Sequence, residues 1–213
     1  MDEYASDRTR MVQEQIERRG LIDERLLVAF KSVPRHLFIP RDYRHYAYDD
    51  GPLPIGFDQT ISQPYIVALM TNLLELIGDE HILEVGTGSG YQAAILSQMG
   101  KDVHTVERIP ALYTRAKNLL KGLGYQNVHC HLADGSLGLS SDAPYGGILV
   151  TAAAPSVPQE LLAQLAEGGR LVLPVGGGGY QVLEIWRREN GILKCRSDIG
   201  VAFVPLRGER GWK

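Results

Sequence analysis

The chain has 213 residues, enough for one α/β domain with a substantial core and too few for two comfortable ones. Its net charge of −3, with 22% charged residues, is ordinary for a globular protein and argues against a basic, nucleic-acid-binding surface over the whole molecule. Two cysteines without a CxxC spacing, an amino terminus without an apolar leader and the lack of an apolar run of about 18 residues predict a cytoplasmic protein with no metal site and no membrane span.

The first 78 residues are predicted to form a cap of helices and loops. Apolar residues at helical spacing predict a helix over residues 5–31, around Gly20, and another over 64–77. Residues 32–60 between them are dense in Pro, Tyr, Asp and Gly. Because this stretch also carries several Leu, Phe and Ile residues, we expect an ordered loop region rather than a flexible linker.

From residue 81 onward, short apolar strands alternate with helices. The strands are expected at 81–85, 103–107, 127–132, 146–151 and 170–175, and the helices at 89–99, 109–121 and 158–166. This alternation is typical of βαβ units, in which a mostly parallel sheet is covered on both faces. The whole chain, 1–213, is therefore expected to be a single domain, with the cap at 1–78 and an α/β core at 79–213.

The end of the chain has a different pattern. Residues 180–188 and 192–196 flank Asn190-Gly191, which is a strong signal for a β-hairpin. Residues 198–205 predict one more strand. We therefore expect an antiparallel edge on the parallel sheet.

The most informative segment is EVGTGSG at 84–90, which follows a predicted buried strand and opens a helix. Glycines let the backbone approach a ligand that a Cβ atom would strike, although a plain tight connection would also use them. A dinucleotide-binding loop would need a third glycine where Tyr91 stands, and the acidic Glu84 precedes a GxGxG spacing. This pattern suits a charged cofactor without phosphate, and it favours S-adenosylmethionine over NAD.

Polar residues at the next two strand ends point to the same site. Glu107 closes the following strand, where a carboxylate can accept hydrogen bonds from both hydroxyls of a ribose. Asp134-Gly135 ends the third strand, at the rim where an open α/β sheet holds its ligand. Alone, Glu107 could cap a helix and Asp134-Gly135 could be a plain turn. At consecutive strand ends they predict a cofactor site.

Several segments together resemble the protein-L-isoaspartate O-methyltransferase family. They are QTISQP (59–64), EVGTGSGYQAA (84–94), LADGS (132–136), GILVTAAAPSVPQELLAQLAEGGRLVLPVG (147–176) and FVPL (203–206). The resemblance runs from about Arg10 to Leu206. It implies an α/β, Rossmann-like class I methyltransferase fold, with a mostly parallel seven-stranded sheet, an antiparallel carboxy-terminal edge and an amino-terminal helical cap. The family often has proline at position 154, where this chain has Ala154, and its tails vary after FVPL, so contacts of Arg207–Arg210 are not carried over.

The resemblance further implies a reaction and roles for residues. S-adenosylmethionine would donate a methyl group, leaving S-adenosylhomocysteine, to the free α-carboxylate of L-isoaspartyl residues in damaged proteins and peptides, whose repair then begins through a succinimide. Ser62 matches the active-site (catalytic) serine, Glu107 the ribose acid and Asp134-Gly135 the adenine contact. The expected cofactor-binding residues are Gln59, Thr60, Ile61, Glu84, Gly86, Gly88, Gly90, Glu107, Asp134 and Gly135, and the expected substrate-binding residues are Pro54, Ile55 and Val204. The expected partners are isoaspartyl-containing proteins and peptides, not nucleic acid or membrane, and we expect a monomer.

The chemistry explains why a serine suffices. A peptide α-carboxyl has a pKa of about 3.5, so it is ionised at neutral pH and needs no strong general base. The reaction needs alignment and the exclusion of water, and one hydroxyl can orient the carboxylate. From the residues alone, Ser62 could equally be an N-cap for the helix at 64–77. A methyltransferase of the same fold acting on a small molecule is the alternative function.

Two dipeptides of the chain are themselves prone to isoaspartate formation. In Asn190-Gly191 and Asp50-Gly51 the glycine offers no side chain to hinder succinimide closure. We hypothesise that the aged protein becomes a weak substrate of itself.

Overall fold

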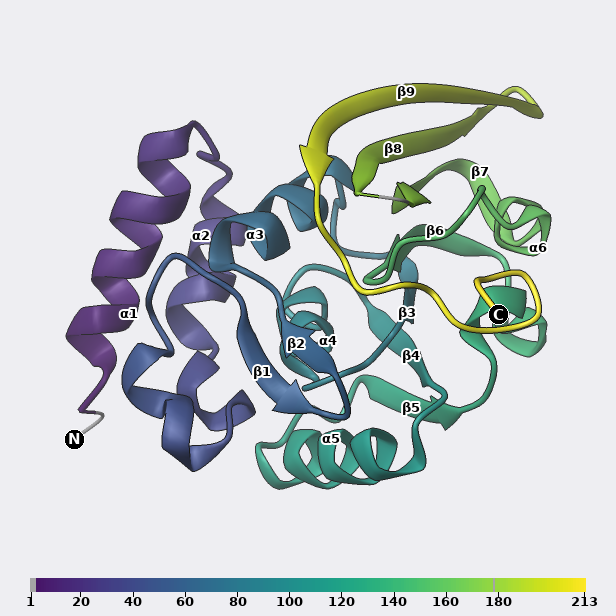
Figure 1. The fold of residues 1–213 in the computed structure, drawn as a ribbon. Coiled ribbons are helices and arrows are strands. Elements are labelled where there is room, and N and C mark those ends of the chain that lie inside the picture. Colours follow the sequence, from purple (N-terminus) through teal and green to yellow (C-terminus); the bar gives the residue numbers. More distant parts are fainter. Residues whose placement is uncertain (1–2, 178) are drawn as a thin grey trace.

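The computed structural model describes residues 3–177 and 179–213, and within them seven strands form one twisted sheet (Figure 1). Their order across the sheet is β5-β4-β3-β6-β7-β8-β9. The strands are β3 (His81–Val85), β4 (Asp102–Glu107), β5 (Val128–Leu132), β6 (Tyr145–Val150), β7 (Leu165–Gly177), β8 (Tyr180–Glu189) and β9 (Ile192–Val201). Pairs from β5 to β7 are parallel, while β7–β8 and β8–β9 are antiparallel. The predicted fold class, with its antiparallel carboxy-terminal edge, is confirmed.

Helices connect the parallel strands as the alternation predicts. They are α4 (Tyr91–Leu96), α5 (Pro110–Gly122) and α6 (Gln159–Ala163). The helix predicted at 158–166 is too long, because β7 already begins at Leu165. In the cap, α3 (Pro64–Leu73) also ends earlier than predicted, because Glu75 adopts a left-handed φ of +48° that cannot continue a helix.

The helix predicted over 5–31 is interrupted. It consists of α1 (Ala5–Met11), a π-helical turn η1 (Val12–Ile16), a short η2 (Glu17–Arg19) and α2 (Glu24–Ser32). Gly20 has a φ of +90°, which ends the first segment. The Asp23 side chain then accepts hydrogen bonds from the backbone N–H groups of Arg25 (2.8 Å) and Leu26 (3.2 Å) and caps α2.

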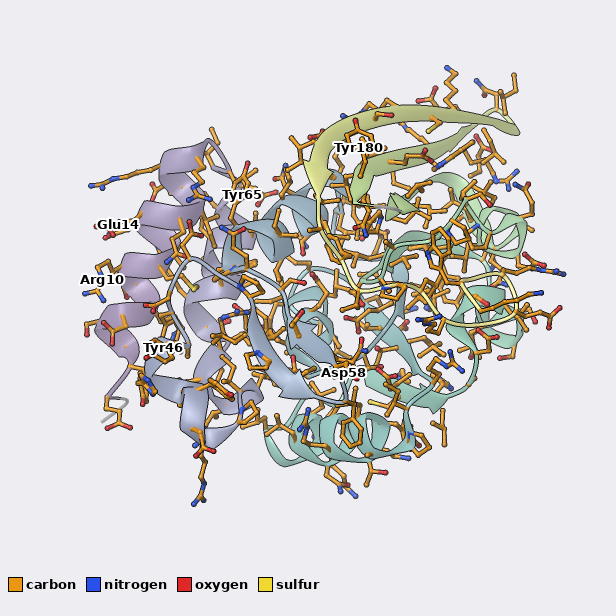
Figure 2. The ribbon with its side chains drawn as sticks, in the orientation of Figure 1. Arg10, Glu14, Tyr46, Asp58, Tyr65 and Tyr180 are labelled. Carbon is orange, nitrogen blue, oxygen red and sulfur yellow. The ribbon has the colours of Figure 1, made fainter. Side chains whose placement is uncertain are left out.

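Residues 32–60 are more regular than the predicted loop region. They contain the short helices η3 (Arg35–Phe38) and η4 (Arg41–Tyr46) and a two-stranded hairpin of β1 (Leu53–Gly56) and β2 (Gln59–Ile61). Phe57 and Asp58 form the tip of the hairpin, each with a φ of +56°. Figure 2 shows Asp58 at this tip, in front of the α/β core in that view.

The prediction of a separate strand at 198–205 is wrong. Residues up to Val201 continue β9, and the chain then leaves the sheet. Beyond Val201, the side chain of Gln181 binds the backbone of Phe203: its Oε1 accepts from the Phe203 N–H (2.6 Å) and its Nε2 donates to the Phe203 carbonyl (3.0 Å). Residues 203–206 then cross the carboxyl end of β6, where Ala153 bonds to Val204 and Leu206 at 2.8 Å each (Figure 1, yellow). The free edge of the sheet is therefore β9 and not the FVPL segment.

The predicted hairpin at Asn190-Gly191 is confirmed. Asn190 and Gly191 have φ values of +52° and +75°, as a two-residue hairpin turn requires. The carboxylate of Glu167 accepts both of their backbone N–H groups, that of Gly191 at 3.0 Å. Within the described ranges, no helix is both long enough and apolar enough to cross a membrane.

Candidate active site

One cavity lies at the carboxyl ends of β3, β4 and β6, with β2 and the 203–207 segment as further walls. It brings together residues predicted from distant parts of the sequence. The predicted residues that line it are Gln59, Thr60, Ile61, Ser62, Glu84, Gly86, Gly88, Glu107, Gly135 and Val204. The predicted residues Pro54, Ile55, Gly90 and Asp134 do not appear in its wall.

The glycine loop owes its shape to contacts with both neighbouring strands. Gly86 has a φ of +99°, and its N–H donates to the Val106 carbonyl of β4 (2.8 Å). On the other side, the Thr151 hydroxyl at the end of β6 donates to the Gly86 carbonyl (2.7 Å). A Cβ atom at position 86 would overlap this hydroxyl, so only glycine fits. Gly90 (φ +87°) instead packs against Leu120 of α5, which gives it a structural position outside the cavity.

Glu107 is held rigidly at the rim. The residue is only 6% exposed. One carboxylate oxygen accepts from the N–H groups of Arg108 and Ile109 (2.9 Å each), and the other accepts from the Gly88 N–H (2.9 Å). A carboxylate has about four acceptor positions, so with three of them taken by backbone N–H groups one remains for a ligand hydroxyl.

Glu84 lies deeper and carries an unsatisfied atom. The residue is fully buried, and its Oε2 accepts a hydrogen bond from Thr105 Oγ1 (2.5 Å), while Oε1 has no partner among the described residues. Burial raises the pKa of Glu84 to about 8, because desolvation disfavours the carboxylate more than the Thr105 hydroxyl stabilises it. An unpartnered buried carboxylate oxygen in a cavity wall fits a cationic ligand group.

Asp134 is expected to contact the ligand directly, but its carboxylate binds other parts of the chain. Its Oδ1 accepts from the backbone N–H (3.0 Å) and the hydroxyl (2.7 Å) of Ser136, and its Oδ2 accepts from the Glu209 N–H (2.7 Å). Asp134 thus ties the carboxy-terminal residues to the end of β5, while its neighbour Gly135 lines the cavity. The adenine contact predicted for the pair is therefore available to Gly135 in this arrangement.

A second cavity meets the first one at Ser62. Both are lined by Thr60, Ser62, Thr151, Phe203 and Val204. The remaining residues of the second wall carry no charge; they are Pro52, Gln63, Ile66, Gly200, Val201 and Ala202. The geometry thus places one serine between a cavity that charged residues line and one that they do not.

The position of Ser62 argues against the helix-capping alternative. The N-cap of α3 is Gln63, and no side chain makes a capping hydrogen bond there. Among residues 3–177 and 179–213, no hydrogen bond to the Ser62 hydroxyl is recorded, so the group is available to a ligand. Pro54 and Ile55 lie in β1, where Ile55 is buried and its carbonyl accepts from Arg115 (2.7 Å).

Thr151 is a wall residue that the motif analysis missed. It lines both cavities and fixes the glycine loop. The sequence does hold a signal for it, because a polar residue directly follows the apolar strand β6, as Glu107 ends β4. Phe203 and Leu206 also line the first cavity, which the FVPL motif could have indicated.

Comparison with known proteins decides the family. The family model described as protein-L-isoaspartate(D-aspartate) O-methyltransferase matches residues 6–211. The chain belongs to this family. A protein-L-isoaspartate O-methyltransferase from Trichlorobacter lovleyi is 54% identical over 207 residues, which cover 97% of this chain and 95% of the relative.

Solved structures named as protein-L-isoaspartate O-methyltransferases have the same fold as this chain. One structure with that name is 28% identical with a TM-score of 0.87, covering 96% of this chain and 67% of the other. A Plasmodium falciparum structure in complex with S-adenosyl-L-homocysteine is 24% identical with a TM-score of 0.82, covering 94% and 98%. The family resemblance found in the sequence is confirmed, and the chain is a methyltransferase rather than an NAD-dependent oxidoreductase.

Proposed function

We propose that this methyltransferase transfers the methyl group of S-adenosylmethionine to the free α-carboxylate of L-isoaspartyl residues in damaged proteins and peptides, and so starts their repair through a succinimide. The observation that carries this proposal is the position of Ser62, which lines both the cavity that holds Glu84 and Glu107 and the uncharged cavity next to it. In a chain of this family, the first cavity suits the methyl donor and the second suits the acceptor.

The residues of the first cavity fit the donor. S-adenosylmethionine, when bound, supplies a methyl group on a positively charged sulfonium. We assign Glu107 to the ribose hydroxyls, because its carboxylate is fixed by three backbone N–H groups. Glu84 offers its unpartnered oxygen to the amino group at the methionine end. Gly86 lets the backbone come close on this side, and Gly135 borders the cavity at the end of β5.

The residues of the second cavity fit an acceptor that is already an anion. An α-carboxylate with a pKa of about 3.5 needs no base, so the chain has to orient it and exclude water. Ser62 would donate one hydrogen bond to it, and apolar wall residues such as Ile66 and Val201 would displace water around it. Of the three predicted substrate contacts, Val204 is the best placed, because it lines both cavities.

A matched pair of peptides tests the proposed function. We expect base-labile labelled methyl to transfer from S-adenosylmethionine to a peptide with one L-isoaspartyl residue and not to the same peptide with aspartate. The isoaspartyl peptide alone carries a free α-carboxylate in mid-chain. Label on neither peptide, while S-adenosylhomocysteine still binds, would contradict the proposal and favour a small-molecule acceptor.

The burial of Glu84 predicts a pH-dependent donor affinity. Because its pKa is raised to about 8, Glu84 is mostly protonated at neutral pH, and a bound ammonium group favours the carboxylate. Binding should therefore release a proton, and S-adenosylhomocysteine affinity should rise from pH 6 toward pH 8 by up to about tenfold per pH unit. Calorimetry in two buffers of different ionisation enthalpy measures this release. Glu84→Gln should abolish it, and equal release by both proteins would contradict the assignment.

We further propose that the cap (1–78) and the core (79–213) act as one domain and as a monomer. The cap supplies Ser62 and the core supplies Glu84 and Glu107, so one chain supplies both walls of the junction between the cavities. Cys130 and Cys195 are free thiols, which fits the reducing environment of the cytoplasm. Isoaspartyl proteins and peptides are the proposed partners.

A further inference from the structure

The cap contains a fully buried arginine next to the junction of the two cavities. Arg35 begins η3, is 0% exposed and is the largest of the fully buried side chains. No ion pair with a carboxylate is recorded for it within the described part of the chain. Desolvation lowers its pKa to about 10, so the guanidinium remains charged at neutral pH.

Arg35 contacts two residues that line the first cavity, Ser62 and Tyr91. Its Nη2 donates to the Ser62 carbonyl and its Nε donates to the Ala47 carbonyl, each at 2.8 Å. The guanidinium also lies over the ring of Tyr91, 4.9 Å from the centroid. Tyr91 is the first residue of α4, directly after the glycine loop, and it lines the first cavity.

The backbone at Ser62 depends on this contact. Ser62 follows the last residue of β2 and precedes Gln63, whose carbonyl accepts the first hydrogen bond of α3, from Val67 (3.1 Å). Neither the strand ladder nor the helix therefore binds the Ser62 carbonyl, and the donor recorded for it is Arg35. Rotation of this peptide unit would move the Ser62 hydroxyl away from the junction.

Packing alone does not explain an arginine at this position. Removing an unpaired charge from water costs several kcal/mol, and an apolar side chain of similar volume would avoid that cost. What the guanidinium supplies is a rigid, planar set of donors that can hold two carbonyls at once. These donors are used on the loop at Ala47 and on the active-site serine.

We propose that Arg35 is a positioning residue for methyl transfer, which fixes the peptide unit of Ser62 and thereby the direction of its hydroxyl. This role rests on the proposed function. Arg35 acts through Ser62 and touches neither the donor nor the acceptor.

A double-mutant cycle with Ser62 tests this role. Arg35→Met and Arg35→Lys are made in the wild-type chain and in the Ser62→Ala variant, and kcat and KM for an isoaspartyl peptide and the affinity for S-adenosylhomocysteine are measured for each. Arg25→Met is the matched control. Arg25 also donates to two carbonyls, those of Leu76 (3.0 Å) and Met99 (2.6 Å), but lines neither cavity.

We expect Arg35→Met to reduce kcat by about tenfold to hundredfold, as the loss of a charged hydrogen bond implies, with S-adenosylhomocysteine affinity within about threefold. Arg35→Lys should restore part of this loss. In the Ser62→Ala background, the same substitutions should change kcat by less than about threefold, because coupled residues are non-additive. Arg25→Met should lower the melting temperature without changing kcat.

If the Arg35 substitutions reduce kcat equally in the wild-type and Ser62→Ala backgrounds, the positioning role is overturned. A loss of kcat that only follows the fraction of unfolded protein would overturn it as well. If Arg35→Met does not fold, Arg35→Lys completes the cycle by itself. If the wild-type enzyme methylates the isoaspartyl peptide but the double-mutant cycle is additive, the role of Arg35 fails and the proposed function stands. Failure of the wild type on that peptide would overturn both.

Discussion

Replacing Ser62 with alanine is expected to lower kcat for an isoaspartyl peptide by about a hundredfold, the effect of removing one donor that orients a reacting group. The affinity for S-adenosylhomocysteine should stay within about threefold, because Ser62 contributes one hydroxyl to a wall formed by many residues. The pH dependence should not change, since Ser62 neither accepts nor delivers a proton in the proposed role. Steady-state kinetics and titration calorimetry measure the two quantities.

Ser32→Ala provides the control for this substitution. The Ser32 hydroxyl donates to the Ala29 carbonyl within α2 (2.8 Å) and lines neither cavity. It should leave kcat unchanged. Cofactor affinity that falls in parallel with kcat in Ser62→Ala would show that Ser62 binds the donor and does not orient the acceptor.

Glu107→Gln is expected to weaken S-adenosylhomocysteine binding by about a hundredfold, the loss of one or two charged hydrogen bonds. The amide keeps the shape of the carboxylate, but its NH₂ group must face either the Gly88 N–H or those of Arg108 and Ile109. In either orientation the NH₂ group faces backbone N–H donors with which it cannot form a hydrogen bond, and the side chain loses an acceptor for the ribose. Calorimetry gives the affinity directly, and the stabilisation by ligand in thermal unfolding should fall with it.

Glu160→Gln is the matched control for Glu107. Glu160 forms an exposed ion pair with Arg210 (2.5 Å), and such pairs contribute little. It should change neither affinity nor kcat by more than about twofold. Unchanged S-adenosylhomocysteine binding in Glu107→Gln would rule out the ribose assignment.

The core of the fold was predictable because its signals are local. Each parallel strand is a short apolar run, and Glu84, Glu107 and Thr151 lie at or next to the carboxyl end of one. Parallel strands bring such ends to a common edge, so neighbouring strands in the sequence supply one site. The same reasoning located Gly86 and Gly88 in the cavity wall.

The parts that could not be predicted depend on unusual turns or on distant side chains. The β1–β2 hairpin turns at Phe57 and Asp58, which have positive φ values without being glycine or asparagine, so Gly56 and Asp58 indicate a turn but not its position between two strands. Where residues 203–206 leave the sheet, the backbone of Phe203 binds the side chain of Gln181, 22 residues away. Asp134 ends its strand as predicted, but its pairing with Glu209, 75 residues away, is invisible in either local motif.

The turn at Asn190-Gly191 affects how this enzyme itself ages. Succinimide closure requires the Gly191 nitrogen to lose its proton and attack the Asn190 side chain. In the folded protein that N–H donates to Glu167 Oε2 (3.0 Å), and a carboxylate at this distance opposes deprotonation. We therefore expect Glu167 to slow succinimide closure at Asn190-Gly191 in the folded protein. The hypothesis of self-methylation therefore applies to copies whose β8–β9 turn has opened, and we expect the lifetime of the intact enzyme in storage to increase with the stability of this hairpin.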